Sequence, residues 1–178
     1  MSIEMGVIIA AVISAGANIY VLIQQRKQNK KMIQLNIIIS ERIEWIHEVR
    51  NLAAEYITEI SKVNTILYFL TSAIDSSDHE YKKLMKEFIQ VRNKSSELYQ
   101  RLTLYFNNEN EHSKLIAPMR DFQVNLTRLI QREKEYGSLN PSYINEYAFD
   151  TDNLQDIISE EIRKYLKAEW ERVKKEMN

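Results

Sequence analysis

Between Gly16 and Pro118 the chain contains neither glycine nor proline, the two residues that most readily interrupt a helix or turn the backbone. The whole sequence of 178 residues has only three glycines and two prolines. A sheet protein needs tight turns at short intervals, and those turns depend on these residue types. About a hundred consecutive positions without them predict helices, so the fold class that we expect is all-α.

The longest expected helix is marked by a repeat in which seam residues alternate spacings of four and three without a slip. The seam residues are Leu35, Ile39, Arg42, Ile46, Val49, Ala53, Tyr56, Ile60, Val63, Leu67, Leu70 and Ile74. Such a repeat predicts a long helix, of coiled-coil type, that packs along one seam. Flanking side chains widen the apolar stripe, namely Ile38, Ile43, Trp45, Leu52, Ile57 and Ile66. A stripe this wide favours a multi-helix bundle over a two-stranded coil.

Three shorter helices are expected after it. The second helix of the bundle should begin after Ser76-Ser77-Asp78 and carry Tyr81, Leu84, Phe88, Val91, Ser95, Leu98, Leu102 and Tyr105. The third should carry Leu115, Met119, Phe122, Leu126 and Leu129, with Pro118 in its first turn and Gly137 at its end. The last should be capped by Thr151 and carry Leu154, Ile158, Ile162, Tyr165, Trp170, Val173 and Met177.

The first 25 residues differ in composition from the rest. No charged residue occurs from Met5 to Ile23, a run of about 19 positions, which is close to the roughly 20 needed to cross a hydrocarbon core. A buried core helix would show a polar stripe, and none occurs before Gln24. A cleaved signal would begin with a basic region, but only Glu4 precedes the run. We therefore expect a transmembrane anchor over residues 1–25.

A basic segment over residues 26–34 follows the anchor. Its cations are Arg26, Lys27, Lys30 and Lys31, and no lysine or arginine precedes the apolar run. The positive-inside rule then places the N-terminus outside and the bundle, residues 35–178, in the cytoplasm. The membrane that we expect the chain to span is the inner or plasma membrane of the cell. We expect a single-pass protein whose four cations contact anionic lipid headgroups.

Within the expected span, small or hydrogen-bonding residues recur every four positions, as Gly6, Ala10, Ser14 and Asn18. This spacing places them in one row along a helix and lets membrane helices approach closely. The row predicts a contact between membrane helices, either with another copy of the chain or with a different protein.

Composition excludes several chemistries. A net charge of −1 gives no general attraction for nucleic acid, so none is expected as a partner. The absence of cysteine excludes disulfides, thiol nucleophiles and cysteine-based zinc sites. The three histidines, His47, His79 and His112, have no metal-ligand spacing. No glycine-rich phosphate loop or nucleophile elbow occurs, and no cofactor or metal is expected.

Arg42 is the one charged residue of the long seam, with Arg50 at its edge and Trp45 nearby. We expect these three as buried polar or amphipathic residues, with Arg42 paired to a carboxylate such as Glu87, Asp121 or Glu161. In the long non-periodic segment after Gly137, the aromatic residues Tyr143, Tyr147 and Phe149 are expected to close the end of the bundle.

Arg42 and His47 also have the Arg-x4-His spacing, which resembles the motif of the HEPN ribonucleases. Those are all-helical dimers that use the arginine and the histidine on RNA, and the resemblance implies a catalytic role for Arg42 and His47. A separation of five residues, however, turns the two side chains about 140° apart on a straight helix.

The run from Ser40 to Arg50, shortly after an N-terminal span, resembles small single-span bacterial and prophage proteins with an Arg-x-x-Trp-Ile stretch. Those proteins have no assigned activity that the resemblance could transfer to this chain. The function that we expect is a membrane-anchored helical interaction protein of scaffold, sensor or phage-exclusion (phage-defence) type, which acts through protein partners or as a homo-oligomer. The alternatives are a membrane-held HEPN-like ribonuclease or toxin and a pore-forming effector.

Overall fold

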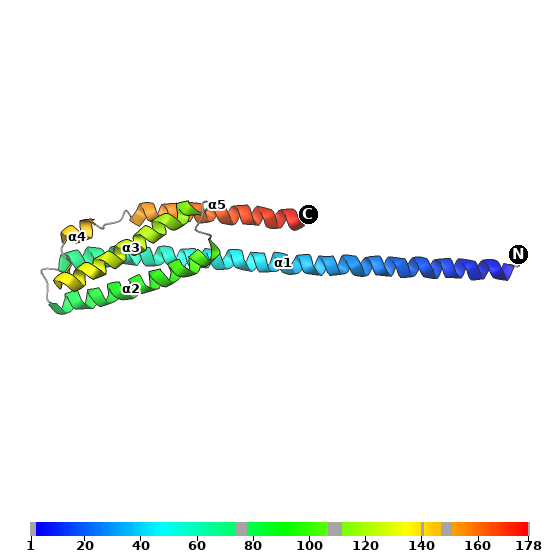
Figure 1. The fold of residues 1–178 in the computed structure, drawn as a ribbon, viewed down its shortest axis with the longest axis horizontal. Helices are drawn as coiled ribbons and strands as arrows, with labels where there is room; N and C mark the ends of the chain where they lie inside the picture. Colours follow the sequence, from blue (N-terminus) through cyan, green and yellow to red (C-terminus); the bar gives the residue numbers. More distant parts are fainter. Residues whose placement is uncertain (1–2, 74–77, 107–111, 140, 147–150, 178) are drawn as a thin grey trace. The chain divides into compact units, whose positions relative to one another are not determined.

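A computed structural model describes the chain except for residues 1–2, 74–77, 107–111, 140, 147–150 and 178. At positions 3–12, 78, 141, 145–146 and 176–177 it describes the backbone alone. Within the described residues there are five helices and no strand, which confirms the all-α class (Figure 1). The helices are α1 (Ile3–Ala73), α2 (Asp78–Tyr105), α3 (Ser113–Tyr136), α4 (Pro141–Glu146) and α5 (Thr151–Met177).

Helix α1 is continuous over 71 residues, so the expected anchor, the basic segment and the first bundle helix are parts of one helix. The segment between the two apolar stretches consists mainly of glutamine, lysine and arginine, which are strong helix formers. Nothing in the sequence after Gly16 would end the helix there. The chain divides into two compact units, Trp45–Glu171 and a second unit of Met1–Glu44 with Arg172–Asn178.

The core of unit Trp45–Glu171 is built on the predicted seams. The described α1 seam residues of this unit, from Ile46 to Leu70, are all buried. The predicted stripe of α3 is also buried throughout, and that of α2 is buried except for the half-buried Leu84 and Tyr105. The helical pattern of the sequence therefore placed most of the core correctly.

Side-chain contacts join the helices of this unit into a bundle. The amide nitrogen of Gln123 on α3 donates to the hydroxyl of Tyr56 on α1 and to that of Ser95 on α2, at 3.2 Å each. The hydroxyl of Ser61 on α1 donates to the amide oxygen of Gln155 on α5 at 3.3 Å. Helices α1, α2, α3 and α5 thus all contribute to one helical bundle.

Two predicted helix ends are confirmed. Helix α3 ends at Gly137, which adopts the left-handed conformation with φ of 72° and donates its N–H to the carbonyl of Glu133 at 2.7 Å. Glycine is favoured there because it has no Cβ to clash in this conformation. Helix α5 begins at Thr151, the residue expected at this end of the helix.

Three details differ from the predictions. Pro118 lies inside α3 rather than in its first turn, because the helix already begins at Ser113, where the carbonyl of His112 accepts from the N–H groups of Leu115 and Ile116. The segment after Gly137 contains the short helix α4, which carries too few residues for a helical period to be read.

The third difference lies on α5, where Trp170 is 41% exposed while Leu166 and Glu169 are buried. The spacing from Ile162 through Leu166 and Glu169 to Val173 keeps the four-three repeat, and Trp170 falls outside it. The prediction that Trp170 belongs to the buried stripe of this helix is therefore wrong. The repeat, rather than hydrophobicity, determines which residues of this helix are buried.

Candidate functional site

The most unusual surface of the molecule lies on α1 in unit Met1–Glu44. Every residue from Ile13 to Gln34 is exposed, and the helix offers apolar side chains around its whole circumference before Gln24. These exposed apolar residues are Ile13, Ile19, Tyr20, Val21, Leu22 and Ile23, with exposed fractions of 48–66%. Large side chains of this kind gain free energy when they leave water, at about 25 cal/mol per Å². A contiguous patch of them indicates a surface that contacts something apolar.

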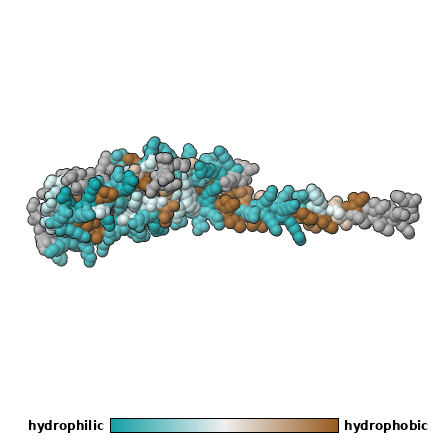
Figure 2. Space-filling model, viewed as in Figure 1, coloured by the Kyte–Doolittle hydropathy of each residue, from teal (hydrophilic) through white to brown (hydrophobic). Residues whose placement is uncertain are grey.

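Directly after this apolar segment lies a charged one. Arg26, Lys27, Lys30 and Lys31 are all exposed, and the residues between them are Gln28 and Asn29. Brown and teal surfaces alternate along this part of α1 in Figure 2. The carboxylates nearest in sequence are Glu4 and Glu41, so the four cations form one uncompensated cluster of positive charge on the helix. Such a cluster can attract anionic groups.

A second apolar stretch follows the cations. Met32, Ile33, Ile37 and Ile38 are 49–59% exposed, whereas Leu35, Ile39 and Arg42 are half-buried. At the other end of the chain in the same unit, Val173 of α5 is fully buried. Along this stretch of α1, the seam residues are therefore only partly covered by other residues of the chain.

No helix within the described part of the chain is both long and apolar enough to cross a membrane. The side chains of residues 3–12 are outside that part, and residues 5–12 among them belong to the run expected to span the membrane from Met5 to Ile23. In the predicted row of small residues, Gly6 and Ala10 are likewise outside it, while Ser14 and Asn18 are exposed. A Cβ added to Gly16 would meet no atom within 4 Å, so the helix surface there is open.

The three residues expected to be buried, Arg42, Trp45 and Arg50, differ in their exposure to solvent. Trp45 is half-buried in an aromatic cluster, with its ring centre 6.0 Å from that of Tyr105 and 5.6 Å from that of Tyr165, both edge-on. Arg50 is exposed, so its prediction as a buried residue is wrong. One position after the buried Val49, its side chain is turned about 100° away from the seam. Arg42 is half-buried and takes part in polar, ionic or ring contacts.

The aromatic cluster extends beyond Trp45. The rings of Phe106 and His112 both contact the ring of Tyr165 edge-on, at 5.0 and 4.9 Å between centres. Beside it, Glu48 accepts a hydrogen bond from the Tyr105 hydroxyl, and this carboxylate raises the pKa of Tyr105. The sequence analysis missed this cluster because its members come from four separate stretches of the chain. His47, the second residue of the ribonuclease alternative, is exposed, and a catalytic role for it stays a prediction.

Sequence reasoning also missed the buried polar group at the centre of the bundle. Gln123 is buried between Tyr56 and Ser95, and its amide oxygen has no hydrogen-bond partner among the residues that the structure describes. Burial raises the pKa of Tyr56 above its ordinary range. The contacts link three helices and offer no group suited to catalysis. Gln123 had no visible signal because it lies one position after Phe122, next to the predicted stripe.

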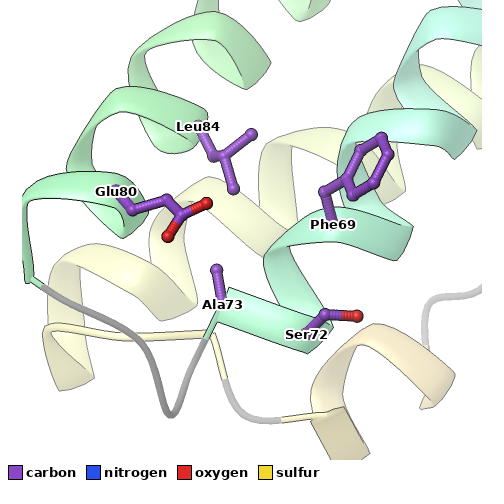
Figure 3. A pocket seen from close by; sticks show the side chains of 5 residues that line it. All are labelled: Phe69, Ser72, Ala73, Glu80 and Leu84. Carbon is purple, nitrogen blue, oxygen red and sulfur yellow. The ribbon is translucent and has the colours of Figure 1, made fainter.

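A small pocket of about 220 Å³ lies between the last residues of α1 and the first residues of α2 (Figure 3). Phe69, Ser72 and Ala73 line it from α1, and Glu80 and Leu84 from α2. Pockets for small ligands usually measure about 300–1,000 Å³, so this pocket is smaller than a usual ligand site.

Across the described residues, no group of three or more histidine, aspartate or glutamate side chains is placed to hold a metal ion. Tyr143, expected near the end of the bundle, contacts Tyr136 and Arg132, and Tyr147 and Phe149 lie outside the described residues.

Comparison with known proteins adds no assignment, because no family, curated protein or solved structure matches the chain.

Proposed function

We propose that this chain is a membrane-anchored helical interaction protein of a bacterium or phage, which works as a scaffold, sensor or phage-exclusion factor. The N-terminal part of α1 is its single membrane span. The bundle is its cytoplasmic part, and it acts through protein partners or through self-association. No catalytic step is assigned to it.

One observation carries the proposal, namely the exposed apolar surface of α1 between Ile13 and Ile23 with four cations directly after it. In water this surface would be a strong aggregation liability, whereas hydrocarbon would cover it on every side. Adding the uncharged residues 5–12 gives a run of about the length that a span needs. Cations at only one end of that run set a direction of insertion.

The cations have a further role in the proposal, because they would lie at the level of the lipid headgroups. A lysine or arginine near an anionic membrane surface contributes about 1 kcal/mol of attraction. Arg26, Lys27, Lys30 and Lys31 are all exposed and fall within an arc of about 140° on one side of the helix. They would therefore contact headgroups along one side of the anchor.

The test is fractionation of bacterial cells that express the full chain with a tag at its C-terminus, followed by protease treatment. We expect the chain to resist extraction from membranes by alkaline carbonate. We also expect its tag to be protected in intact cells and digested in inverted vesicles. Digestion of the tag in intact cells would contradict the orientation, and release by carbonate would contradict the anchor.

Matched variants sharpen this test. Ile13→Arg places a charge near the centre of the apolar run, which costs about 2.5–3.5 kcal/mol on insertion, and should increase the fraction extracted by carbonate. Ile13→Leu is its control and should behave as the parent chain. Replacement of Arg26, Lys27, Lys30 and Lys31 by glutamine should randomise the orientation. The control replaces Lys82, Lys83, Lys86 and Lys114, which are equally exposed in the bundle, and should keep the orientation.

A further inference from the structure

The seam of the bundle helix continues backward along α1 into its exposed N-terminal part. From Ile39 toward the N-terminus, the four-three spacing runs without a slip through the following residues. They are Leu35, Met32, Gln28, Gln25, Val21, Asn18 and Ser14. Helix α1 is unbroken over this range, so the repeat becomes a continuous stripe on its surface. From Ser14 to Met32 every member of the stripe is exposed.

The charges of this part of α1 all avoid the stripe. On a helix of 3.6 residues per turn, the eight residues from Ser14 to Ile39 fall within an arc of about 100°. The cations Arg26, Lys27, Lys30 and Lys31 fall in the remaining arc of about 260°. Where the stripe passes through the charged segment it carries Gln25 and Gln28, which are polar and uncharged. Arg42, the first charged residue on the seam, is half-buried within the chain itself.

This charge pattern favours one partner for the stripe, a second copy of the same helix. In a parallel pair of identical helices, each seam residue faces its own copy, so a lysine there would face another lysine. Glutamine or asparagine can instead donate to and accept from its own copy. A partner with acidic residues would be matched by cations on the seam, and the seam has none before Arg42.

The heptad positions support the same partner. With Leu35 at position d and Ile39 at position a, Asn18 also occupies position a. A single buried asparagine at this position specifies the register and a parallel two-stranded state in coiled coils. Between membrane helices, such an amide also stabilises association, because its partner replaces the water that hydrocarbon lacks.

We infer that a second copy of this chain covers the stripe from Ser14 to Met32, as a parallel pair of α1 helices that begins in the membrane and continues through the headgroup region. The inference rests on the proposed function, which supplies the membrane and the common orientation of the copies. In this pair Asn18 bonds to Asn18 of the second copy. The cations project from the side of each helix opposite the stripe, toward lipid headgroups.

The natural absence of cysteine allows a direct test, because a single introduced cysteine can form a disulfide only with its own counterpart. Gln25→Cys and Gln28→Cys place the thiol on the stripe. Ile23→Cys and Lys30→Cys place it off the stripe at neighbouring positions. In oxidised membranes that hold the full chain, we expect strong dimer bands for the first two variants and weak bands for the last two. Equal bands at all four positions, or none at any, would overturn the inference.

A charge swap tests the cause of the pattern. In the Gln25→Cys background, Lys27→Gln with Gln28→Lys moves one cation onto the stripe and leaves the net charge unchanged. We expect the dimer band to fall several-fold. The control, Lys27→Gln with Gln34→Lys, moves the cation to another off-stripe position and should keep the band. An unchanged band in both would overturn the argument from charge.

The two proposals fail separately. A chain that stays in carbonate-washed membranes and shows no stripe-specific disulfide keeps the proposed function and loses the second copy. A chain that carbonate releases and that still gives stripe-specific disulfides loses the anchor and keeps the pair. Preferential disulfides between co-expressed Gln25→Cys and Lys30→Cys chains would indicate a different register or direction and would overturn the parallel pair.

Discussion

At the scale of single residues, the hydrogen bonds at the centre of the bundle couple its stability to pH. The Tyr56 hydroxyl is buried and accepts a bond from Gln123. Burial raises the pKa of Tyr56 above its ordinary value of 10.0, so the folded state holds this proton more tightly than the unfolded state does. Burial likewise raises the pKa of Tyr81, whose hydroxyl accepts the backbone N–H of Leu139 at 2.7 Å.

The sign of the resulting pH dependence follows from linkage. Because the folded pKa lies above the unfolded one, the stabilisation is complete below about pH 10 and is lost as the pH rises toward the folded value. We therefore expect the free energy of unfolding to be flat from neutral pH to about pH 9 and to fall steeply above about pH 10. The free energy of unfolding is measured by urea denaturation of the full chain in detergent, with circular dichroism as the signal.

The variant Tyr56→Phe distinguishes the contribution of Tyr56 to this pH dependence from that of the other tyrosines. Near pH 7 the variant should lose about 1 kcal/mol, because Gln123 loses one acceptor. Above about pH 10 its free energy of unfolding should fall less steeply than that of the parent. Tyr20→Phe is the control, since Tyr20 is exposed, and it should leave both quantities unchanged. Parallel curves for Tyr56→Phe and the parent would contradict the assignment.

At the scale of helices, the sequence predicted what repeats and missed what depends on contacts across the fold. The seam of α1 and the stripe of α3 could be predicted because apolar residues recur along them with the period of a helix. The predictions for Arg50 and Trp170 are wrong because each residue lies one position after a buried residue of the repeat, Val49 and Glu169, and so faces away from the core. The aromatic cluster around Trp45 and Tyr165 could not be predicted, because nothing in the sequence states which helix faces which.

The end of α3 offers a prediction at this scale. Gly137→Ala should destabilise the bundle by about 1 kcal/mol, because an alanine at φ of 72° is strained although its Cβ would meet no other atom. Gly137→Asn should cost less, since asparagine tolerates this conformation. Gly16→Ala is a control with a glycine inside a helix, where alanine is the better helix former. Thermal unfolding should show a loss only for Gly137→Ala and Gly137→Asn, in that order, and an equal loss for both would contradict the role of the left-handed turn.

At the scale of the whole molecule, the proposed anchor and the core use different residues. Among the described residues, every buried side chain lies at or after Ile46, and α1 before Leu35 contributes none from Ile13 onward. The exposed apolar surface of α1 is therefore not needed to complete the core of unit Trp45–Glu171. Membrane attachment and folding should then be separable by cutting the chain within α1.

A chain that begins at Leu35 should fold and leave the membrane. Because it keeps every buried side chain that the structure describes, we expect its midpoint of thermal unfolding to lie within a few degrees of that of the full chain, a shift that corresponds to less than about 1 kcal/mol. We expect it in the soluble fraction, since it lacks both the apolar run and the four cations. A chain that begins at Tyr56 is the contrasting control. It lacks the buried Ile46, Val49, Leu52 and Ala53, and burial of such side chains contributes about 1.5–3 kcal/mol each for the larger ones, so it should fail to fold cooperatively. An unfolded chain from Leu35 would show that the core depends on the N-terminal part of α1, and the proposed division between anchor and bundle would be wrong.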